Sequence, residues 1–415
     1  MTELEKQGSL AQKASRVLMT ASSGVKDRAL NAIADMLEKE ADAILKANAD
    51  DIALAKEAGM REALIDRLLL TKERISGIAK GVREVSALPD PIGAVESTVV
   101  RPNGLIIGRK TVPLGVIAII YEARPNVTAD AAALCLKSGN AAILRGGKEA
   151  FRSNAAIMEI MRRAVASAGL PEDCVSLVQD TSRESARELM QLDEYVDVLI
   201  PRGGAGLIRS VVENSRVPVI ETGVGNCHVF IDETADIKMG AEIIFNAKCQ
   251  RPSVCNAAET MLVHRNIAEK FLPEAKKLLD TKNTEIRGCP ETASILGPSV
   301  VPAQESDWYT EYGDYILAVK VVSGIDEAIE HINKYNTGHS EAIVTNDYTN
   351  AQRFLNEIDA AAVYVNASTR FTDGGEFGLG AEIGISTQKM HARGPMGLKQ
   401  LTSCKYVIYG SGQIR

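Results

Sequence analysis

The chain has 415 residues and a mass of 44.6 kDa, which corresponds to two or three domains of ordinary size. Hydrophobic residues make up 45% of the chain and charged residues 24%, so it can bury a large core and is not disordered. The 54 acidic residues outnumber the 47 basic ones, and only 4% of the residues are aromatic. These values argue against a protein that binds nucleic acid. They leave room for a local basic pocket that binds an anionic small molecule.

Cysteine and histidine residues are scattered along the sequence rather than grouped. The seven cysteines form no CxxC pair and the five histidines form no HExxH motif, which predicts reduced thiols and no metal site. The N-terminal segment carries acidic residues and lacks a continuous apolar core, so it does not resemble a signal peptide. The apolar run VIAIIY (116–121) is far shorter than the roughly 20 residues that cross a bilayer. We therefore expect a cytoplasmic protein that does not bind membranes.

The first part of the chain is predicted to be helical. Residues 1–88 show apolar side chains at intervals of three and four, which is typical of amphipathic helices. The segment PDPIG (89–93) ends this series. Residues 95–101 and 105–112 are rich in β-branched side chains and flank the turn sequence Pro-Asn-Gly, so they predict a β-hairpin.

From residue 115 onward, short apolar runs alternate with helical segments. The runs GVIAIIY (115–121) and NAAILRGG (140–147) lack polar alternation, which is typical of a parallel sheet covered on both faces. A second cycle of strands and helices begins near residue 227, and a last strand is expected at 401–410. The sequence thus predicts an α/β fold with two parallel sheets, whose ligands bind beyond the carboxyl ends of the strands.

Two predicted strands end in glycine-rich sequences with basic side chains, LRGGK (144–148) and PRGGAG (201–206). Neither contains the GxGxxG fingerprint or a P-loop, so the standard phosphate cradles are absent. Each sequence alone is compatible with a solvated turn, although a strand end that leads into a helix also forms an anion site. Two such ends in one parallel sheet favour a nucleotide-binding cleft.

Cys255 is the candidate nucleophile, in the non-helical link RPSVCNAAET (251–260). A lone cysteine is more often a small buried hydrophobic residue. Against that interpretation, Arg251 and Lys248 precede it closely, and positive charge lowers the pKa of a thiol. The sequence His339-Ser340-Glu341 contains the residue types of a hydrolytic triad. Because adjacent residues do not normally form that relay, we do not predict a serine hydrolase.

Four segments carry a resemblance that covers essentially the whole chain; they are residues 113–147, 250–259, 321–343 and 389–398. They resemble the γ-glutamyl phosphate reductase family of the aldehyde dehydrogenase superfamily. The resemblance implies an α/β, aldehyde-dehydrogenase-like fold with two doubly wound parallel-sheet domains and a small β oligomerisation arm. The implied parts are an NADP-binding domain (1–94 and 113–226, with part of 362–400), a catalytic domain with Cys255 (227–361) and the arm (95–112 and 401–415).

The resemblance also implies roles for individual residues. Cys255 matches the nucleophilic cysteine of the superfamily. The superfamily's oxyanion-binding asparagine is replaced by Ala123, and we expect Asn126 to take its place. Glu221 matches the glutamate that activates water in hydrolytic members, a role that a phosphate-linked reaction does not need. The residues expected to bind NADP(H) are Arg145, Gly146, Lys148, Gly203, Gly204 and Glu311. The residues expected to bind the substrate are Arg124, Arg251, His391 and Arg393.

The implied activity is the NADPH-dependent reduction of L-glutamyl 5-phosphate to L-glutamate 5-semialdehyde and phosphate through a thioester on Cys255, in proline biosynthesis. Two alternatives stay open, a hydrolytic aldehyde dehydrogenase of the same fold and a non-catalytic nucleotide-binding scaffold. The expected assembly is a homo-oligomer, either a dimer or a dimer of dimers. Glutamate 5-kinase is a further expected partner, for transfer of a labile intermediate.

Overall fold

The computed structural model describes residues 1–415, apart from the side chain of Ala63. The chain forms two compact units. Unit 1 contains residues 1–222, 378–384 and 396–415, and unit 2 contains residues 223–377 and 385–395. Among the described residues, no helix combines the length and the apolar character that crossing a bilayer requires.

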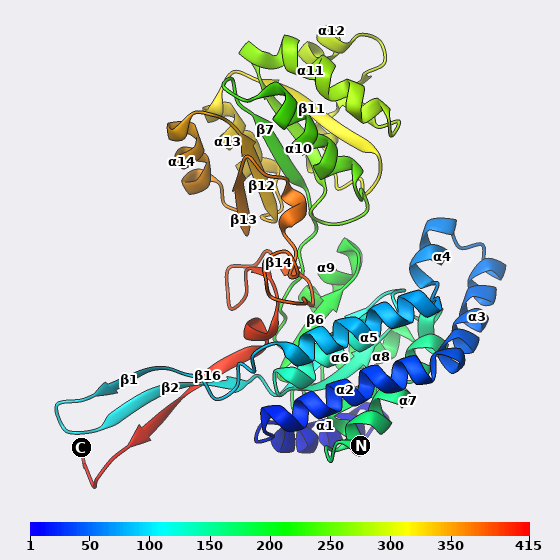
Figure 1. The fold of residues 1–415 in the computed structure, drawn as a ribbon, viewed down its shortest axis with the longest axis vertical. Coiled ribbons are helices and arrows are strands. Elements are labelled where there is room, and N and C mark those ends of the chain that lie inside the picture. Colours follow the sequence, from blue (N-terminus) through cyan, green and yellow to red (C-terminus); the bar gives the residue numbers. More distant parts are fainter. The chain divides into compact units, whose positions relative to one another are not determined.

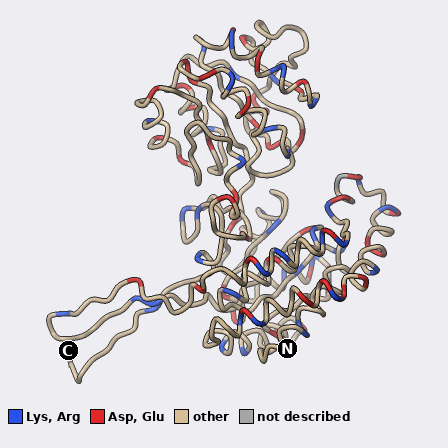
Figure 2. The backbone as a smooth tube through the Cα atoms, in the orientation of Figure 1, with Lys and Arg blue, Asp and Glu red and all other residues tan. Residues whose placement is uncertain are grey.

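Unit 1 begins with the predicted series of helices (Figure 1): α1 (Glu3–Leu18), α2 (Ser23–Lys39), α3 (Ala41–Glu57), α4 (Glu62–Leu68) and α5 (Lys72–Ala87). A capping box between Thr2 and Glu5 begins α1, and the Thr71 hydroxyl accepts a hydrogen bond from the third residue of α5. Acidic and basic residues are interleaved along these helices (Figure 2). Two buried lysines join α2 to its neighbours: Lys26 pairs with Asp90 at 2.5 Å, and Lys137 pairs with Asp27 at 2.5 Å.

The sheet of unit 1 has four parallel strands in the order β5-β4-β3-β6. The strands are β3 (Val116–Tyr121), β4 (Ala141–Arg145), β5 (Val175–Leu177) and β6 (Val198–Arg202), and the helices that follow them are α6 (Asn126–Lys137), α7 (Phe151–Ser167), α8 (Arg183–Met190) and α9 (Ala205–Asn214). Every residue of β3 is buried, and alternate residues such as Val116 and Ala118 pack against α1 and α8. The sheet is therefore covered on both faces, as its unbroken apolar strands predict.

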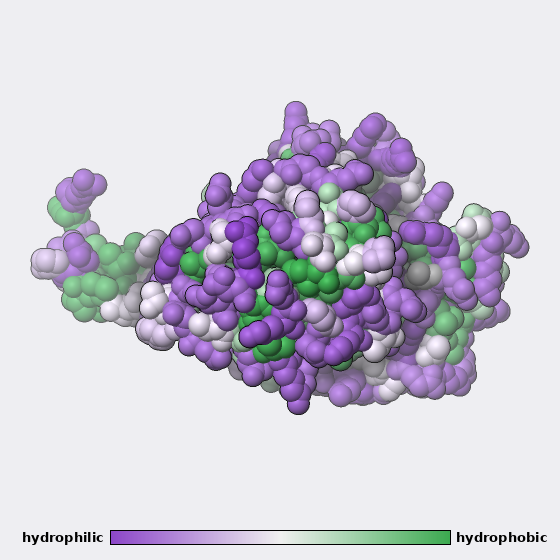
Figure 3. Space-filling model, turned by 90° about the horizontal axis from the view of Figure 1, so that it is seen from above, coloured by the Kyte–Doolittle hydropathy of each residue, from purple (hydrophilic) through white to green (hydrophobic). Residues whose placement is uncertain are grey.

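The arm consists of β1 (Val95–Val100), β2 (Ile106–Pro113) and β16 (Thr402–Tyr409), paired antiparallel in the order β1-β2-β16. Gly104 adopts a positive φ of 84° in the turn between β1 and β2, a conformation that suits glycine. The arm projects from the helices of unit 1 (Figure 1), and much of its tip is hydrophobic, at the left of Figure 3. Its exposed apolar side chains are Val95, Val99, Val100, Ile106, Tyr406, Ile408 and Tyr409.

Unit 2 contains a seven-stranded parallel sheet in the order β10-β9-β11-β8-β7-β12-β13. Its strands are β7 (Cys227–Ile231), β8 (Ala258–His264), β9 (Glu285–Gly288), β10 (Val301–Pro302), β11 (Ile316–Val322), β12 (Ser340–Val344) and β13 (Ala362–Val365). Its helices are α10 (Ile237–Cys249), α11 (Arg265–Asp280), α12 (Pro290–Leu296), α13 (Ile325–Tyr335) and α14 (Tyr348–Glu357). A short antiparallel pair, β14 (Ile385–Ser386) and β15 (Gly394–Pro395), completes the unit.

The helices of unit 2 cover both faces of this sheet. Val229 and Ile231 of β7 pack with α10 and α11, whereas Phe230 between them packs with α13 and α14. This alternation is the doubly wound arrangement expected from the sequence. The end of the second unit differs from the expected boundary at residue 361, because β13 forms a parallel ladder with β12 and keeps residues up to 377 in unit 2.

Candidate active site

Cys255 lies in the turn-rich link between α10 and β8, and its backbone is held by residues from another segment. The Sγ of Cys227 donates a hydrogen bond to the carbonyl oxygen of Cys255 at 3.2 Å. A Cβ atom on Gly225 would lie 1.4 Å from that same oxygen, so no other residue fits at position 225 without moving the backbone of the loop. The nucleophile loop, residues 250–257, is thereby fixed on the side of β7.

Asn256, the next residue, is held by the segment around the 3₁₀ helix η4 (Thr369–Phe371). Its side-chain nitrogen donates to the carbonyl oxygens of Arg370 at 3.2 Å and Thr372 at 2.9 Å. The Thr369 hydroxyl donates to the Asn256 carbonyl at 2.7 Å, and the Arg370 guanidinium donates to the Asn256 side-chain oxygen. Gly225, Asn256 and Arg370 are not among the site residues predicted from the sequence. The nearest signal for Gly225 is its place in the glycine-rich segment ETGVG, whereas nothing near Arg370 in the sequence indicates its contact with Asn256.

Two buried groups lie behind the nucleophile loop. Burial raises the pKa of the Cys227 thiol well above its ordinary value, so Cys227 stays protonated and can donate to the Cys255 carbonyl. Its sulfur is 3.8 Å from Nδ1 of His339, and burial lowers the pKa of His339 to about 4. His339 is therefore neutral at pH 7 and contributes no charge to the loop.

The residues His339, Ser340 and Glu341 do not form a hydrolytic triad. Nδ1 of His339 is hydrogen-bonded to Ser340 Oγ at 2.8 Å, so the two adjacent residues do meet. The carboxylate of Glu341, however, bonds to His228 at 3.0 Å, and His339, Ser340 and Glu341 are fully buried. This geometry agrees with the prediction against a serine hydrolase, since no carboxylate among the described residues bonds to His339.

In unit 1, the strand ends that were expected to bind NADP(H) differ in exposure. Arg145 ends β4, and its Nη2 donates to the carbonyl oxygens of Thr181 at 2.7 Å and Ser182 at 2.8 Å. Burial lowers the pKa of Arg145, and its Nε is buried with no partner among the described residues. Lys148 is exposed. Gly146 faces inward, because a Cβ there would lie 2.2 Å from the side-chain nitrogen of buried Asn154.

The second strand end leads into the N-terminus of α9. Gly204 is the N-cap residue of this helix, and its N–H donates to the Glu122 carboxylate at 3.1 Å. Gly203 passes close to the same carboxylate, since a Cβ there would lie 2.7 Å from its carbon. An anionic group thus already lies at this helix start, as the positive end of a helix dipole favours.

Glu311 lies in unit 2, beside a buried ion pair. Desolvation raises its pKa, while a hydrogen bond from the Gly225 backbone N–H and the charge of Lys248 oppose the rise. Lys248 pairs with Glu259 at 2.5 Å, both fully buried, and Glu259 also accepts the N–H of Gly313 at 3.2 Å. The buried pair therefore anchors the loop that carries Glu311.

The remaining predicted residues are distributed over both units. Asn126 donates to the Asp130 carboxylate at 2.9 Å in unit 1, where Arg124 is exposed. In unit 2, Arg393 pairs with Asp359 at 2.6 Å, and His391 is an exposed residue with a φ of 66°. Arg251 is in the nucleophile loop. Of the four residues predicted to bind the substrate, the structure places Arg251 in the same loop as Cys255.

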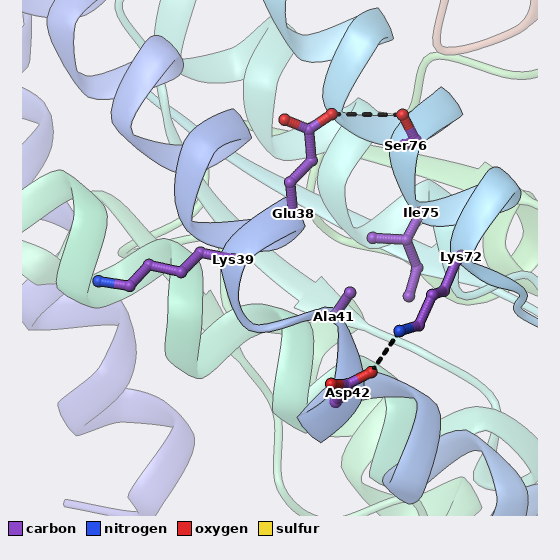
Figure 4. Close-up of a pocket in the computed structure, with 7 residues that line it drawn as sticks. All are labelled: Glu38, Lys39, Ala41, Asp42, Lys72, Ile75 and Ser76. Carbon is purple, nitrogen blue, oxygen red and sulfur yellow. Dashed lines mark hydrogen bonds and ion pairs between the residues drawn. The ribbon is translucent and has the colours of Figure 1, made fainter.

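The structure also has a recess of about 290 Å³ between α2, α3 and α5, outside the predicted site (Figure 4). Two interactions cross it: Lys72 pairs with Asp42 at 3.0 Å, and Ser76 donates to Glu38 at 3.3 Å, whereas Lys39 points away from these residues (Figure 4). None of the predicted site residues lines it.

The fold agrees with the folds of related proteins. The chain matches the family model described as the aldehyde dehydrogenase family over residues 2–314 and 310–407. An acetylating aldehyde dehydrogenase from Geobacillus thermoglucosidasius has the same fold, with a TM-score of 0.72 at 18% identity, covering 100% of this chain and 97% of that one. The chain belongs to the aldehyde dehydrogenase family of oxidoreductases.

Closer relatives narrow this assignment. The chain is 59% identical over 418 residues to a γ-glutamyl phosphate reductase of Caldicellulosiruptor bescii, covering 100% of both chains. It is 61% identical over 413 residues to that of Clostridium perfringens, covering 100% of this chain and 99% of that one. The crystal structure of a γ-glutamyl phosphate reductase from Thermotoga maritima superposes with a TM-score of 0.97 at 51% identity, covering 100% of both chains. Within the aldehyde dehydrogenase family, the chain therefore groups with the γ-glutamyl phosphate reductases.

Proposed function

We propose that this enzyme reduces L-glutamyl 5-phosphate to L-glutamate 5-semialdehyde and phosphate with NADPH, as a step of proline biosynthesis. The observation that carries the proposal is the fixed nucleophile loop, in which Gly225, Cys227 and Asn256 hold the backbone of Cys255. The identity of 59–61% to γ-glutamyl phosphate reductases supports the choice of substrate.

The chemistry proposed for Cys255 is covalent. Its thiolate attacks the acyl carbon, the C–S bond forms, and the C–O bond to phosphate breaks, which leaves a thioester. When bound, NADPH supplies the hydride that reduces this thioester. The resulting thiohemiacetal collapses, releases the aldehyde and restores the thiolate. The Cys255 backbone N–H and the Asn126 amide are the proposed oxyanion donors, each worth about 3 kcal/mol.

The residues of unit 1 fit a dinucleotide phosphate. Arg145 has a buried Nε without a partner among the described residues, and its two hydrogen bonds to carbonyl oxygens hold the guanidinium in place without neutralising it. With Lys148, it would bind the 2′-phosphate that distinguishes NADP from NAD. Gly203 and Gly204 would bind the pyrophosphate at the start of α9, in exchange with the Glu122 carboxylate. In unit 2, Glu311 would bind the nicotinamide ribose.

The deciding experiment is the oxidation of glutamate 5-semialdehyde with NADP⁺, in the presence and absence of inorganic phosphate. We expect NADPH formation only with phosphate, because the thioester needs phosphate as its acceptor in this direction. Equal rates without phosphate would instead support a hydrolytic enzyme that uses Glu221. A non-catalytic nucleotide-binding scaffold would form no NADPH in either assay. Its nucleotide binding would also stay unchanged after alkylation of Cys255.

For the assembly, we propose that the arm extends a sheet of a second copy of the chain, giving a dimer or a dimer of dimers. The exposed apolar residues of β1 and β16 support this, since an unpaired apolar edge in water promotes aggregation. Glutamate 5-kinase is the proposed partner for direct transfer of the labile acyl phosphate.

A further inference from the structure

Arg370 places a half-buried guanidinium group beside the nucleophile loop. Its Nη1 donates to the side-chain oxygen of Asn256, the residue after Cys255, and its Nε donates to the side-chain oxygen of Gln250 at 3.0 Å. Both acceptors are neutral amides. These hydrogen bonds therefore orient the guanidinium of Arg370 but do not neutralise its charge.

Arg251 adds a second positive charge to the same loop. Its side chain is exposed, and no hydrogen bond or ion pair of its guanidinium occurs among the described residues. Burial lowers the pKa of Arg370, and the nearby charge of Arg251 lowers it further. Asp373 offsets part of this effect, although its Oδ1 already accepts the N–H groups of Gly375 at 2.8 Å and Glu376 at 3.3 Å. The two guanidinium groups thus form an electropositive site at the loop of the nucleophile.

We propose that Arg370 and Arg251 form the subsite that binds the phosphate group of the substrate and receives it as the leaving group. This inference rests on the proposed function and adds its leaving-group site. A phosphate carries up to two negative charges and several acceptor oxygens. It is therefore a better ligand for two guanidinium groups than a single carboxylate is. When the Cys255 sulfur bonds to the acyl carbon, phosphate is on that same carbon, whereas the α-carboxylate of the substrate is attached three carbons further along the chain. The anion nearest to Cys255 is therefore the phosphate.

The transfer balances within this site. The Cys255 thiol loses its proton and forms the C–S bond, and the C–O bond breaks with its electron pair on oxygen. The departing phosphate takes up one proton, which matches the proton lost by the thiol. The oriented guanidinium of Arg370 and the charge of Arg251 stabilise the negative charge that develops on that oxygen.

Protection of Cys255 from alkylation by inorganic phosphate tests the subsite without turnover. The full-length protein is treated with iodoacetamide, without nucleotide or substrate, over a range of phosphate concentrations, and modification of the Cys255 peptide is followed by mass spectrometry. We expect phosphate to slow the modification at least tenfold. Arg370→Gln and Arg251→Gln should each require at least tenfold more phosphate for half-protection. Arg353→Gln is the matched control in unit 2, because Arg353 pairs with Asp326 and Glu357 instead, and it should be protected like the wild type.

The Arg251→Gln variant distinguishes an effect on phosphate binding from an effect on the structure of the nucleophile loop. Arg370→Gln also removes the hydrogen bond to Asn256, whereas Arg251 makes no such contact with the loop among the described residues. Unchanged phosphate protection in Arg251→Gln would overturn the proposal. The same alkylation assay is repeated with glutarate, a dicarboxylate, in place of phosphate. If both variants lost the protection by glutarate but kept the protection by phosphate, the proposal would also be overturned. A protein that shows the expected protection but no reductase activity would retain the phosphate subsite and refute only the proposed function.

Discussion

The candidate residues lie at the carboxyl ends of the strands in unit 1 and at the amino ends of the strands in unit 2. In unit 1, Arg145 and Gly203 stand at the carboxyl ends of β4 and β6, with β3 between them. In unit 2, Gly225 and Cys255 precede β7 and β8, so the nucleophile loop lies at the amino ends of those strands. Ligands of parallel sheets usually bind beyond the carboxyl ends of the strands. The candidate residues of unit 1 follow this rule, and the nucleophile loop of unit 2 does not.

The two sets of candidate residues also differ in the contacts that position them. The strand ends of unit 1 are formed by residues that follow their strands directly, and the parallel ladder brings them together. The loop of Cys255 depends on contacts with residues about 30 and 115 positions away in the sequence, namely Gly225 and Arg370. We therefore expect substitutions at the strand ends of unit 1 to change nucleotide binding locally, and substitutions in the nucleophile loop and its contacts in unit 2 to change the chemical step.

The largest effect is expected for Cys255→Ser in unit 2. A serine hydroxyl is almost never ionised at pH 7 without a dedicated base, so kcat should fall by about a thousandfold or more. The dissociation constant for NADPH, measured by fluorescence titration, should stay within about twofold of the wild type. Turnover like that of the wild type in the serine variant would exclude the covalent mechanism.

The substitution Gly225→Ala tests the close contact between Gly225 and the Cys255 carbonyl. The added Cβ would overlap the carbonyl of Cys255, so the loop must shift, and a displacement near 1 Å costs roughly a hundredfold in rate. Steady-state kinetics should show this loss in kcat, with little change in the KM for NADPH.

Gly77→Ala is the control for Gly225→Ala. Gly77 lies inside α5, and no atom outside that helix is within 4 Å of the place that an added Cβ would take. Alanine should therefore raise stability by about 0.5–1 kcal/mol and leave activity unchanged. If Gly225→Ala behaved like this control, the proposed contribution of position 225 to the geometry of Cys255 would be wrong.

Unit 1 is tested by Arg145→Ala. Loss of charge-assisted hydrogen bonds worth about 1.5–3 kcal/mol should weaken NADPH binding by roughly tenfold or more, with a much smaller effect on NADH. Titration of the variant with both nucleotides would measure this difference, and Arg145→Lys should restore part of it. A variant that kept the full preference for NADPH would contradict the assignment of the 2′-phosphate to Arg145.

The same contrast explains what could be predicted from the sequence. Both parallel sheets were predicted because strands buried on two faces must be continuously apolar, as VIAIIY of β3 is. Cys255 was predicted as the nucleophile from its non-helical link near Arg251 and Lys248 and from the resemblance, which covers its segment. Gly225 and Arg370 were missed, since a backbone clamp arises from the packing of distant segments and has no local pattern. The end of unit 2 was misplaced for a related reason: β13 is only half-buried, and its sequence does not reveal that β12 is its neighbour.

The smallest expected change concerns the arm, which lies in unit 1 but serves neither strand end. Deletion of residues 402–415 removes β16, so β2 loses its hydrogen-bonded neighbour along Ile106–Pro113. A two-stranded hairpin is marginally stable in water, so β1 and β2 alone should no longer support an interface. Light scattering should then report about half the wild-type mass, and activity should fall with it. If the truncated chain kept both its mass and its turnover, the arm would fold against its own unit rather than join a second chain.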